Sequence, residues 1–158
     1  MAVYFYKTSH PFSNFYPCLF QDEEGIEFNC SEQYFMYQKC LTFDPENRNL
    51  LTKILKETNP KKIKALGRKV RNYSEEVWQR DRYDHMVQGL KYKFDQNDNL
   101  KEILLETEGF IYEASPTDRI WGIGFSVGKA PEVDPLLYGQ NLLGLALMDV
   151  RDFITGIE

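Results

Sequence analysis

The sequence predicts a mainly α-helical protein with a small β-sheet, of the α+β class. Apolar residues recur at three- and four-residue intervals over much of the chain, which is the spacing of one helical face. Strand-like segments are few and short. No internal repeat, low-complexity segment or Gly/Ser-rich linker divides the sequence, so we expect residues 1–158 to form a single compact domain.

Three short segments have the composition of strands. They are AVYFY (residues 2–6), GIEFN (25–29) and FIYEAS (110–115). Between the first two lies SHPFSNFYPC (9–18), whose two prolines predict a loop.

Six helices are expected, most of them preceded by a residue that favours a helix start. The proposed N-caps are Ser31, Asn59 (followed by Pro60), Ser74, Asp98 and Asn141. The corresponding helices span about residues 31–40, 46–58, 60–70, 75–94, 99–107 (ended by Gly109) and 142–153, with the fourth burying Tyr83, Met86, Val87, Leu90 and Phe94 and the last burying Leu142, Leu145, Ala146, Val150 and Phe153.

Bulk composition narrows the classes of function. A net charge of −5 argues against a broad electrostatic hold on nucleic acid, and no apolar run is long enough to cross a bilayer. Three cysteines without a CxxC motif and an N-terminus unlike a secretory signal favour the cytoplasm. With only two histidines and no nucleotide-binding glycine motif, we expect no metal site and no cofactor. The sequence leaves the oligomeric state open.

The run CSEQYFMYQK places a carboxylate and an ammonium on an otherwise apolar helical face. Glu32, Phe35, Met36 and Lys39 share that face at helical spacing. Glu32 in a first turn complements the helix dipole, which explains it without a function. Because its neighbours indicate burial, the alternative is a general base or a group that stabilises positive charge. Lys39 either binds an anion or extends its ammonium to solvent.

A second group of candidates lies in the long loop of residues 115–135, which is rich in glycine and proline. Asp118 can accept hydrogen bonds from ring amines, Trp121 can stack on a planar heterocycle, and Gly122 lets the backbone approach a ligand. The structural alternative is a capping turn with Trp121 in the core.

Three further polar residues are weaker candidates. Arg68, beside Gly67 near a helix end, is the cation of its segment best suited to bind phosphate as a fork. Asn14, flanked by phenylalanines in FSNF, orients a ligand or forms a turn. Asn141 caps the last helix, where exposed amides also suit an anion.

These segments, FSNF, SEQYFMYQK, ALGRKV, VWQRDRYDHMVQGLKYKF, SPTDRIWGIG and GQNLLGLALMDVR, occur in an order that resembles the YbiA-like, or NADAR, family of N-glycosidases. The resemblance covers roughly residues 12–151. It implies a compact, mainly helical domain that cleaves a C–N glycosidic bond without metal or cofactor. It places the catalytic glutamate at Glu32, functional tryptophans at Trp78 and Trp121, and the motif aspartate at Asp118.

The resemblance also implies a small phosphorylated ribosyl substrate. The expected activity is hydrolysis of ribosylamino-pyrimidine 5′-phosphates of the riboflavin pathway, with release of ribose 5-phosphate. In this hypothesis Glu32 faces the ribose and Lys39 or Arg68 holds the phosphate, while Trp121 or Trp78 stacks on the base and Asp118 binds its amino groups. The alternatives are hydrolysis of ADP-ribose or NAD-derived N-glycosides, and a non-catalytic module that binds such ligands.

Overall fold

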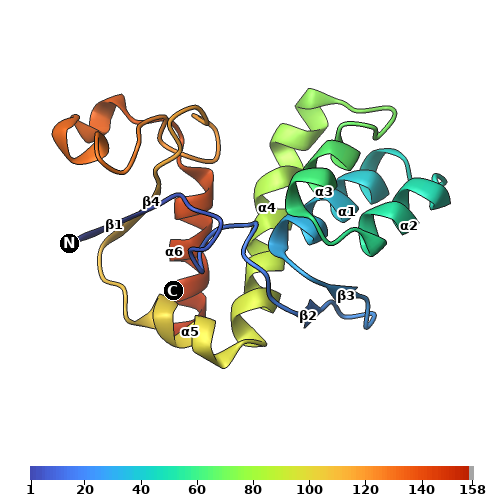
Figure 1. Ribbon diagram of the computed structural model, residues 1–158, viewed down its shortest axis with the longest axis horizontal. Helices are drawn as coiled ribbons and strands as arrows, with labels where there is room; N and C mark the ends of the chain where they lie inside the picture. Colours follow the sequence, from blue (N-terminus) through green and yellow to red (C-terminus); the bar gives the residue numbers. More distant parts are fainter. Residues whose placement is uncertain (157–158) are drawn as a thin grey trace. The chain divides into compact units, whose positions relative to one another are not determined.

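The computed structural model describes residues 1–156 and confirms the predicted α+β class, with helices dominating (Figure 1). Contacts within the chain divide it into two units. The first unit contains residues 1–13 and 98–158, and the second contains residues 14–97.

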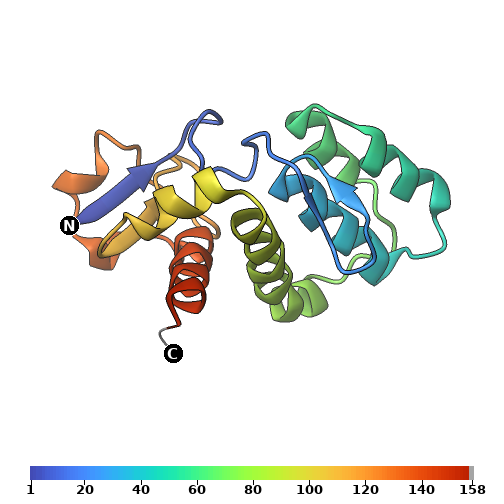
Figure 2. The ribbon, with the colours of Figure 1, turned by 90° about the horizontal axis from the view of Figure 1, so that it is seen from below.

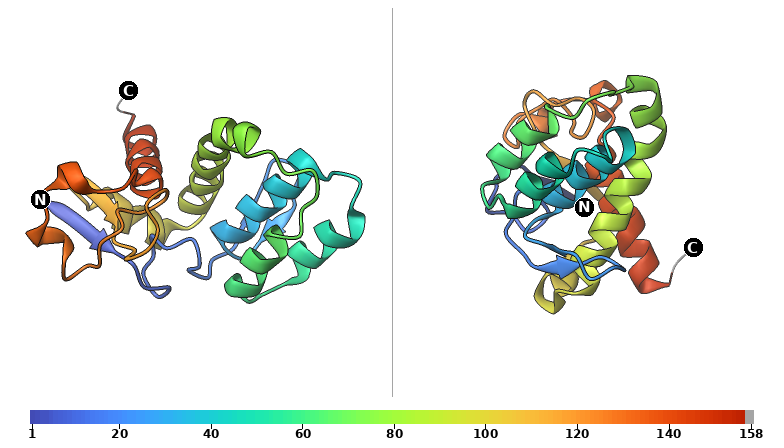
Figure 3. Two further views of the ribbon diagram at one scale, coloured as in Figure 1. Left: turned by 90° about the horizontal axis from the view of Figure 1, so that it is seen from above. Right: turned by 90° about the vertical axis from the view of Figure 1, so that its right-hand side faces the viewer.

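The second unit is built around one buried helix. Helix α1 packs against α2, α3 and α4, and all of residues 31–37 are buried, so that its polar residues are enclosed together with its aromatic ones. Figure 3 shows α1, α2 and α3 grouped in this unit. The elements are β2 (Phe20–Gln21), β3 (Glu27–Phe28), α1 (Ser31–Phe43), α2 (Arg48–Lys56), α3 (Pro60–Gly67) and α4 (Glu75–Asp95).

The first unit places one helix against a parallel pair of strands. Strands β1 and β4 run side by side with Ala2 opposite Phe110 and Phe5 opposite Glu113, and α6 packs on β4 (Figure 2). Helix α5 packs against α6. The elements are β1 (Ala2–Phe5), α5 (Asp98–Leu105), β4 (Phe110–Glu113), α6 (Leu142–Thr155) and two short 3₁₀ helices, Ala130–Glu132 and Pro135–Leu137.

The strands pair differently from a single small sheet. The strand predicted near residue 2 pairs with the one near residue 110. The strand near residue 27 pairs instead with β2, which follows the predicted loop of residues 9–18 and was not predicted. Two-residue strands are too short to show the alternation by which strands are recognised, and this explains why β2 was missed.

Two helix starts match the prediction and two differ from it. The side chains of Asn59 and Ser74 accept hydrogen bonds from backbone N–H groups of the first turns of α3 and α4, as N-caps do. Ser31, however, is not an N-cap: it is the first residue of α1, whose N-cap is Cys30. Asp98 is likewise the first residue of α5 rather than its cap.

The face of α6 was also predicted wrongly in part. Ala146 and Val150 are buried as expected, but Leu145 and Phe153 are exposed. Leu143 and Leu147 are fully buried instead. These two leucines lie one helical turn apart, so the buried stripe is rotated relative to the one chosen from the sequence.

Close packing between α6 and β4 depends on a glycine. A Cβ atom at Gly144 would lie 2.1 Å from the carbonyl oxygen of Ile111 and 2.3 Å from the side-chain nitrogen of Asn141. A backbone carbonyl cannot move aside without disturbing the strand, so this position accepts no side chain.

We therefore predict that Gly144→Ala lowers the free energy of unfolding by about 1–3 kcal/mol, as over-packing does in a close-packed core. Urea unfolding followed by circular dichroism measures it. Gly128→Ala is the matched control, because a Cβ there meets nothing within 4 Å. Equal midpoints for the two variants would contradict the packing role of Gly144.

Candidate active site

The amino end of α1 is held by a loop that lies far from it in the sequence. The backbone N–H of Glu32 donates to the carbonyl oxygen of Asn14 at 3.0 Å, and the hydroxyl of Ser31 donates to Asn14 Oδ1 at 2.9 Å. The structure therefore brings together two predicted site residues, Asn14 and Glu32. The side chain of Glu32 is only 7% exposed, which is the burial that its apolar neighbours indicated.

Gln33, which sequence analysis did not single out, fixes the same helix end. It is fully buried, and its Oε1 accepts a hydrogen bond from the backbone N–H of Asn29 at 2.7 Å. Its Nε2 donates to the carbonyl oxygens of Ile54, Leu55 and Glu57 at the end of α2. Because an amide that bridges two chain segments resists rotation, the backbone beside Glu32 is held rigidly.

Lys39 lies two turns further along α1 and is half-buried. Its ammonium nitrogen is 4.8 Å from the centroid of the Tyr73 ring, in a cation–π contact. Burial lowers the pKa of Lys39, the carboxylates of Glu32 and Glu75 act to raise it, and the guanidinium of Arg68 acts to lower it. The charge of Lys39 is therefore coupled electrostatically to that of Glu32, and also to those of Arg68 and Glu75.

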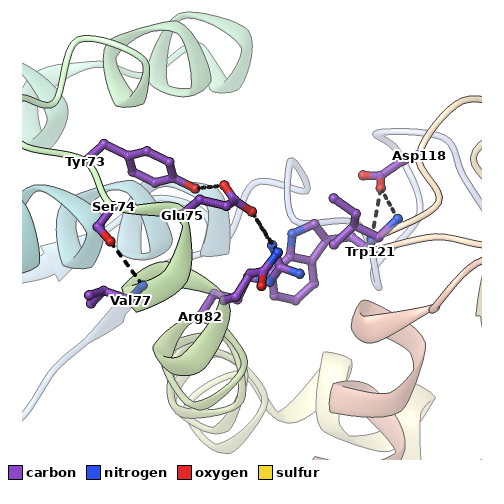
Figure 4. A network of polar contacts seen from close by, with 9 residues as sticks. Tyr73, Ser74, Glu75, Val77, Arg82, Asp118 and Trp121 are labelled. Carbon is purple, nitrogen blue, oxygen red and sulfur yellow. Dashed lines mark hydrogen bonds and ion pairs between the residues drawn. The ribbon is translucent and has the colours of Figure 1, made fainter.

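Tyr73, whose ring Lys39 contacts, belongs to a polar network with Glu75 and Arg82 of α4 (Figure 4). The hydroxyl of Tyr73 donates to Glu75 Oε2 at 2.5 Å, and Arg82 Nη1 lies 3.8 Å from Glu75 Oε1. The hydrogen bond from Tyr73 is the main cause of the lowered pKa of Glu75, whereas burial and this bond raise the pKa of Tyr73 to about 12. None of these three residues was predicted, because tyrosine, glutamate and arginine at a helix start are also typical of a solvated surface.

The other predicted residues of this unit differ in their surroundings. Trp78 is buried, with its ring 5.1 Å from that of Phe35 and stacked on that of His85 at 5.5 Å. Arg68 is the C-cap of α3 and is exposed. Both stay candidate substrate-binding residues, but Trp78 also has a clear packing role.

A fully buried lysine lies beneath the loop that holds α1. The ammonium of Lys93 is 5.9 Å from the centroid of the Tyr16 ring and 5.2 Å from that of Phe94. Burial lowers the pKa of Lys93 to about 8, against an ordinary value of 10.5, and the thiols of Cys18 and Cys30 act in the opposite direction. Lys93 is thus close to the two chain segments that meet at Asn14 and Ser31.

In the first unit, Asp118 forms a tight turn with the residues that follow it (Figure 4). Its Oδ1 accepts hydrogen bonds from the backbone N–H groups of Ile120 and Trp121, each at 2.9 Å. Its own backbone N–H donates to the hydroxyl of Ser115 at 3.1 Å. The structural alternative for Asp118, a capping turn, is therefore present. It uses one of the two carboxylate oxygens.

The backbone after this turn is bonded to the start of α6. The carbonyl oxygens of residues 119–123 accept hydrogen bonds from the N–H groups of residues 139–143, including Trp121 from Leu143 at 3.0 Å. A Cβ at Gly122 would lie 2.7 Å from the backbone carbonyl oxygen of Glu113, which cannot move aside easily, so glycine is required here for packing on β4. The expected role of Gly122, close approach to a ligand, stays a prediction.

Asn141 precedes α6 in a left-handed conformation, with φ of 55°, and its side chain does not cap the helix. Instead Oδ1 accepts from the backbone N–H of Glu113 at 3.0 Å, and Nδ2 donates to the carbonyl oxygen of Ile111 at 2.9 Å. Asn141 is thus the N-cap residue of α6, as predicted, but it makes no capping hydrogen bond because β4 offers two backbone partners to its amide. Its predicted part in ligand binding is not tested by these contacts.

A model of the NADAR domain matches residues 4–155 of the chain. The chain belongs to the NADAR family. Protein irg-1 of Caenorhabditis elegans is 40% identical to it over 95% of this chain and 78% of the worm protein. N-glycosidase R617 of Acanthamoeba polyphaga mimivirus is 39% identical over 90% of this chain and 86% of the viral protein.

A plant relative and a solved structure extend the comparison. Riboflavin biosynthesis protein PYRR, chloroplastic, of Zea mays is 33% identical over 98% of this chain, which spans 25% of that protein. The NMR structure of the E. coli protein YbiA matches with a TM-score of 0.77 and 25% identity, covering 98% of this chain and 85% of that one. The predicted family and its fold are confirmed.

Within residues 1–156, no helix has the length and apolar character that a membrane span requires. The same residues contain no group of three or more His, Cys, Asp or Glu side chains arranged to hold a metal ion.

The buried ammonium of Lys93 gives a prediction about pH. Between about pH 8 and pH 10, the unfolded chain binds a proton at this position that the folded chain has released, so the free energy of unfolding rises with pH by up to about 1.4 kcal/mol per unit. This rise should appear in the difference between the wild type and Lys93→Met, measured by urea unfolding across that range.

Taking the difference removes the effect of cysteines and tyrosines that titrate at similar pH in both proteins. Lys64→Met, which replaces an exposed lysine of α3, is the control and should show no such difference. Parallel stability curves for the wild type and Lys93→Met would show that the folded protein does not shift the titration of Lys93.

Proposed function

We propose that this chain is an N-glycosidase that hydrolyses the C–N ribosyl bond of phosphorylated ribosylamino-pyrimidines and releases ribose 5-phosphate. The observation that carries the proposal is the burial of the Glu32 carboxylate at the amino end of α1. Relatives named N-glycosidase support the reaction class. Relatives named riboflavin biosynthesis proteins support the pyrimidine substrate.

The reaction requires negative charge beside the sugar. As the C1′–N bond breaks, its electron pair leaves with the nitrogen and C1′ acquires positive charge, as in other glycosyl transfers. An ionised Glu32 stabilises this cation and accepts a proton from the water that attacks C1′. The leaving nitrogen takes up a proton, and the products are the sugar phosphate and the free aminopyrimidine.

The remaining predicted residues bind the two ends of the substrate. Lys39, half-buried and electrostatically coupled to Glu32, is proposed to attract the phosphate, with Arg68 as a more exposed cation nearby. Trp121 is proposed to stack on the pyrimidine, since Trp78 already packs against Phe35 and His85. The Asp118 oxygen that the turn does not use is proposed to accept hydrogen bonds from the amino groups of the base.

Glu32→Gln is predicted to reduce kcat at least about a hundredfold, because removal of one preorganised electrostatic group raises the barrier by about 2.7–4 kcal/mol. Release of reducing sugar from the ribosylamino-pyrimidine phosphate measures the rate. Glu76→Gln is the matched control: Glu76 also lies in the first turn of a helix but is exposed, so its loss should leave the rate within about twofold. Equal rates for wild type and Glu32→Gln would end the assignment.

Asp118→Asn separates the turn from recognition of the base. Asparagine keeps the oxygen that accepts from residues 120 and 121, so the melting temperature should change little. Loss of the negative charge should raise KM roughly tenfold, the difference between a charged and a neutral hydrogen bond. An unchanged KM would show that Asp118 forms the turn but does not bind the base.

A substrate panel identifies the ribosyl compound. Ribose 5-phosphate as the product supports the proposal, whereas release of ADP-ribose would assign the same chemistry to an ADP-ribose conjugate. Tight binding without any sugar release would instead indicate a non-catalytic module.

A further inference from the structure

Arg82 on α4 is a buried cation whose hydrogen-bonding capacity is poorly used. Its side chain is 10% exposed, and its Nε has no hydrogen-bond partner among residues 1–156. Its ion-pair partner Glu75 lies 3.8 Å from Nη1, beyond hydrogen-bond distance. A buried guanidinium nitrogen without a partner reduces stability, because no hydrogen bond replaces the hydration that Nε loses on folding.

A second arginine on the same helix shows the contrast. Arg80 is 71% exposed, yet its Nε and Nη2 donate to the two carboxylate oxygens of Asp81 at 2.9 and 3.2 Å. An arginine that served only to stabilise α4 would be expected to have its fork satisfied where it is buried. Here the exposed fork is satisfied and the buried one is not.

The counter-ion of Arg82 is shared and accessible. Glu75 is 57% exposed, and Tyr73 and Gln79 hold its carboxylate oxygens at 2.5 and 3.2 Å. The same carboxylate acts on Lys39, which also senses Glu32. Two partly or largely buried cations, Lys39 and Arg82, therefore share one exposed carboxylate as a counter-ion.

We propose that Arg82 is the residue that binds the substrate phosphate as a fork, and that the phosphate displaces Glu75 as its counter-ion. This inference rests on the proposed function and assigns its phosphate site. A planar guanidinium with free N–H groups matches two phosphate oxygens, which a single ammonium does not. Arg68, which the sequence suggested as the phosphate-binding arginine, is exposed at the end of α3, so water can satisfy its N–H groups.

The test compares kcat/KM for a ribosylamino-pyrimidine with and without its 5′-phosphate. Arg82→Met, which keeps the length of the side chain, should lower the preference for the phosphorylated compound roughly 10- to 100-fold. Arg82→Lys keeps the charge but not the fork and should lower it less. Arg80→Met is the matched control and should keep the wild-type preference.

The melting temperature is a second readout. It should rise when Arg82 is replaced, whereas it would fall if Arg82 had only a structural role. Removing the unsatisfied buried charge should raise the melting temperature of the free protein by about 2–4 °C in Arg82→Met. Inorganic phosphate should stabilise the wild type in thermal shift and should not stabilise Arg82→Met. Arg80→Met should respond to phosphate as the wild type does.

The outcomes separate this inference from the proposed function. If the wild type hydrolyses neither compound but phosphate and ribose 5-phosphate stabilise it through Arg82, the proposed reaction fails and the anion site stands. If hydrolysis occurs and Arg82→Met keeps the preference for phosphate, the assignment of Arg82 is overturned. A lower melting temperature together with equal losses on both compounds would also overturn it, by showing a structural role.

Discussion

The burial of a carboxylate at the amino end of α1 is the constraint on which the second unit depends. Glu32 is enclosed together with the aromatic residues of the same helix, so its charge must be stabilised by the protein. The first-turn amides and the helix dipole favour the ionised form. The N-cap Cys30 contributes no side-chain hydrogen bond, and the carbonyl of Asn14 accepts from the Glu32 N–H instead. A residue of a distant loop thus takes the place of the N-cap as acceptor for a first-turn N–H group.

The hydrogen bonds that replace the cap also fix the position of the Glu32 backbone. Asn14, Ser31 and Gln33 tie the start of α1 to the loop before β2 and to the end of α2. These ties involve backbone atoms, the buried hydroxyl of Ser31 or the buried amide of Gln33, which move less than exposed side chains. In the proposed mechanism, a carboxylate carried on such a frame does not need to reorganise as charge develops on the substrate, which is how electrostatic catalysis is most effective.

The charges on α1 and α4 show the usual conflict between stability and function. Lys39, Glu75 and Arg82 are coupled by electrostatics, although two of them are partly or largely buried and one salt bridge is long. A sequence selected for stability alone would replace the buried cations with apolar side chains. Their presence fits a binding site whose missing counter-ion is supplied by a ligand.

Much of the architecture could be predicted because it follows from local signals. Asn59 with Pro60, and Ser74 with its two glutamates, announce their helices through chemistry within one turn. Ser31 is also a residue type that favours a helix N-cap, but its hydroxyl donates to Asn14, which is distant in the sequence. Asn141 likewise bonds to β4 rather than to its own helix. Local patterns cannot reveal a competing partner that is distant in the sequence.

The residues of the proposed site differ in the same way, according to whether their signal is local. Glu32 and Lys39 were found because a charge on an apolar helical face is a local anomaly. Arg82 and Gln33 were missed because arginine and glutamine within a polar stretch look ordinary, and only their burial and hydrogen bonds distinguish them. Their signal belongs to the tertiary structure, where the question is whether each buried polar atom has a partner.

Asp118 shows why a structural role does not exclude the binding role proposed for it. Oδ1 closes the turn that fixes the backbone of Trp121, and the segment after it is bonded to the start of α6. The turn thereby immobilises both the carboxylate and the backbone that carries the indole. A residue that recognises a ligand must be held still, and hydrogen bonds to its own loop are the simplest way to do so. Glu32 follows the same logic, since the helix end that stabilises its charge also orients it.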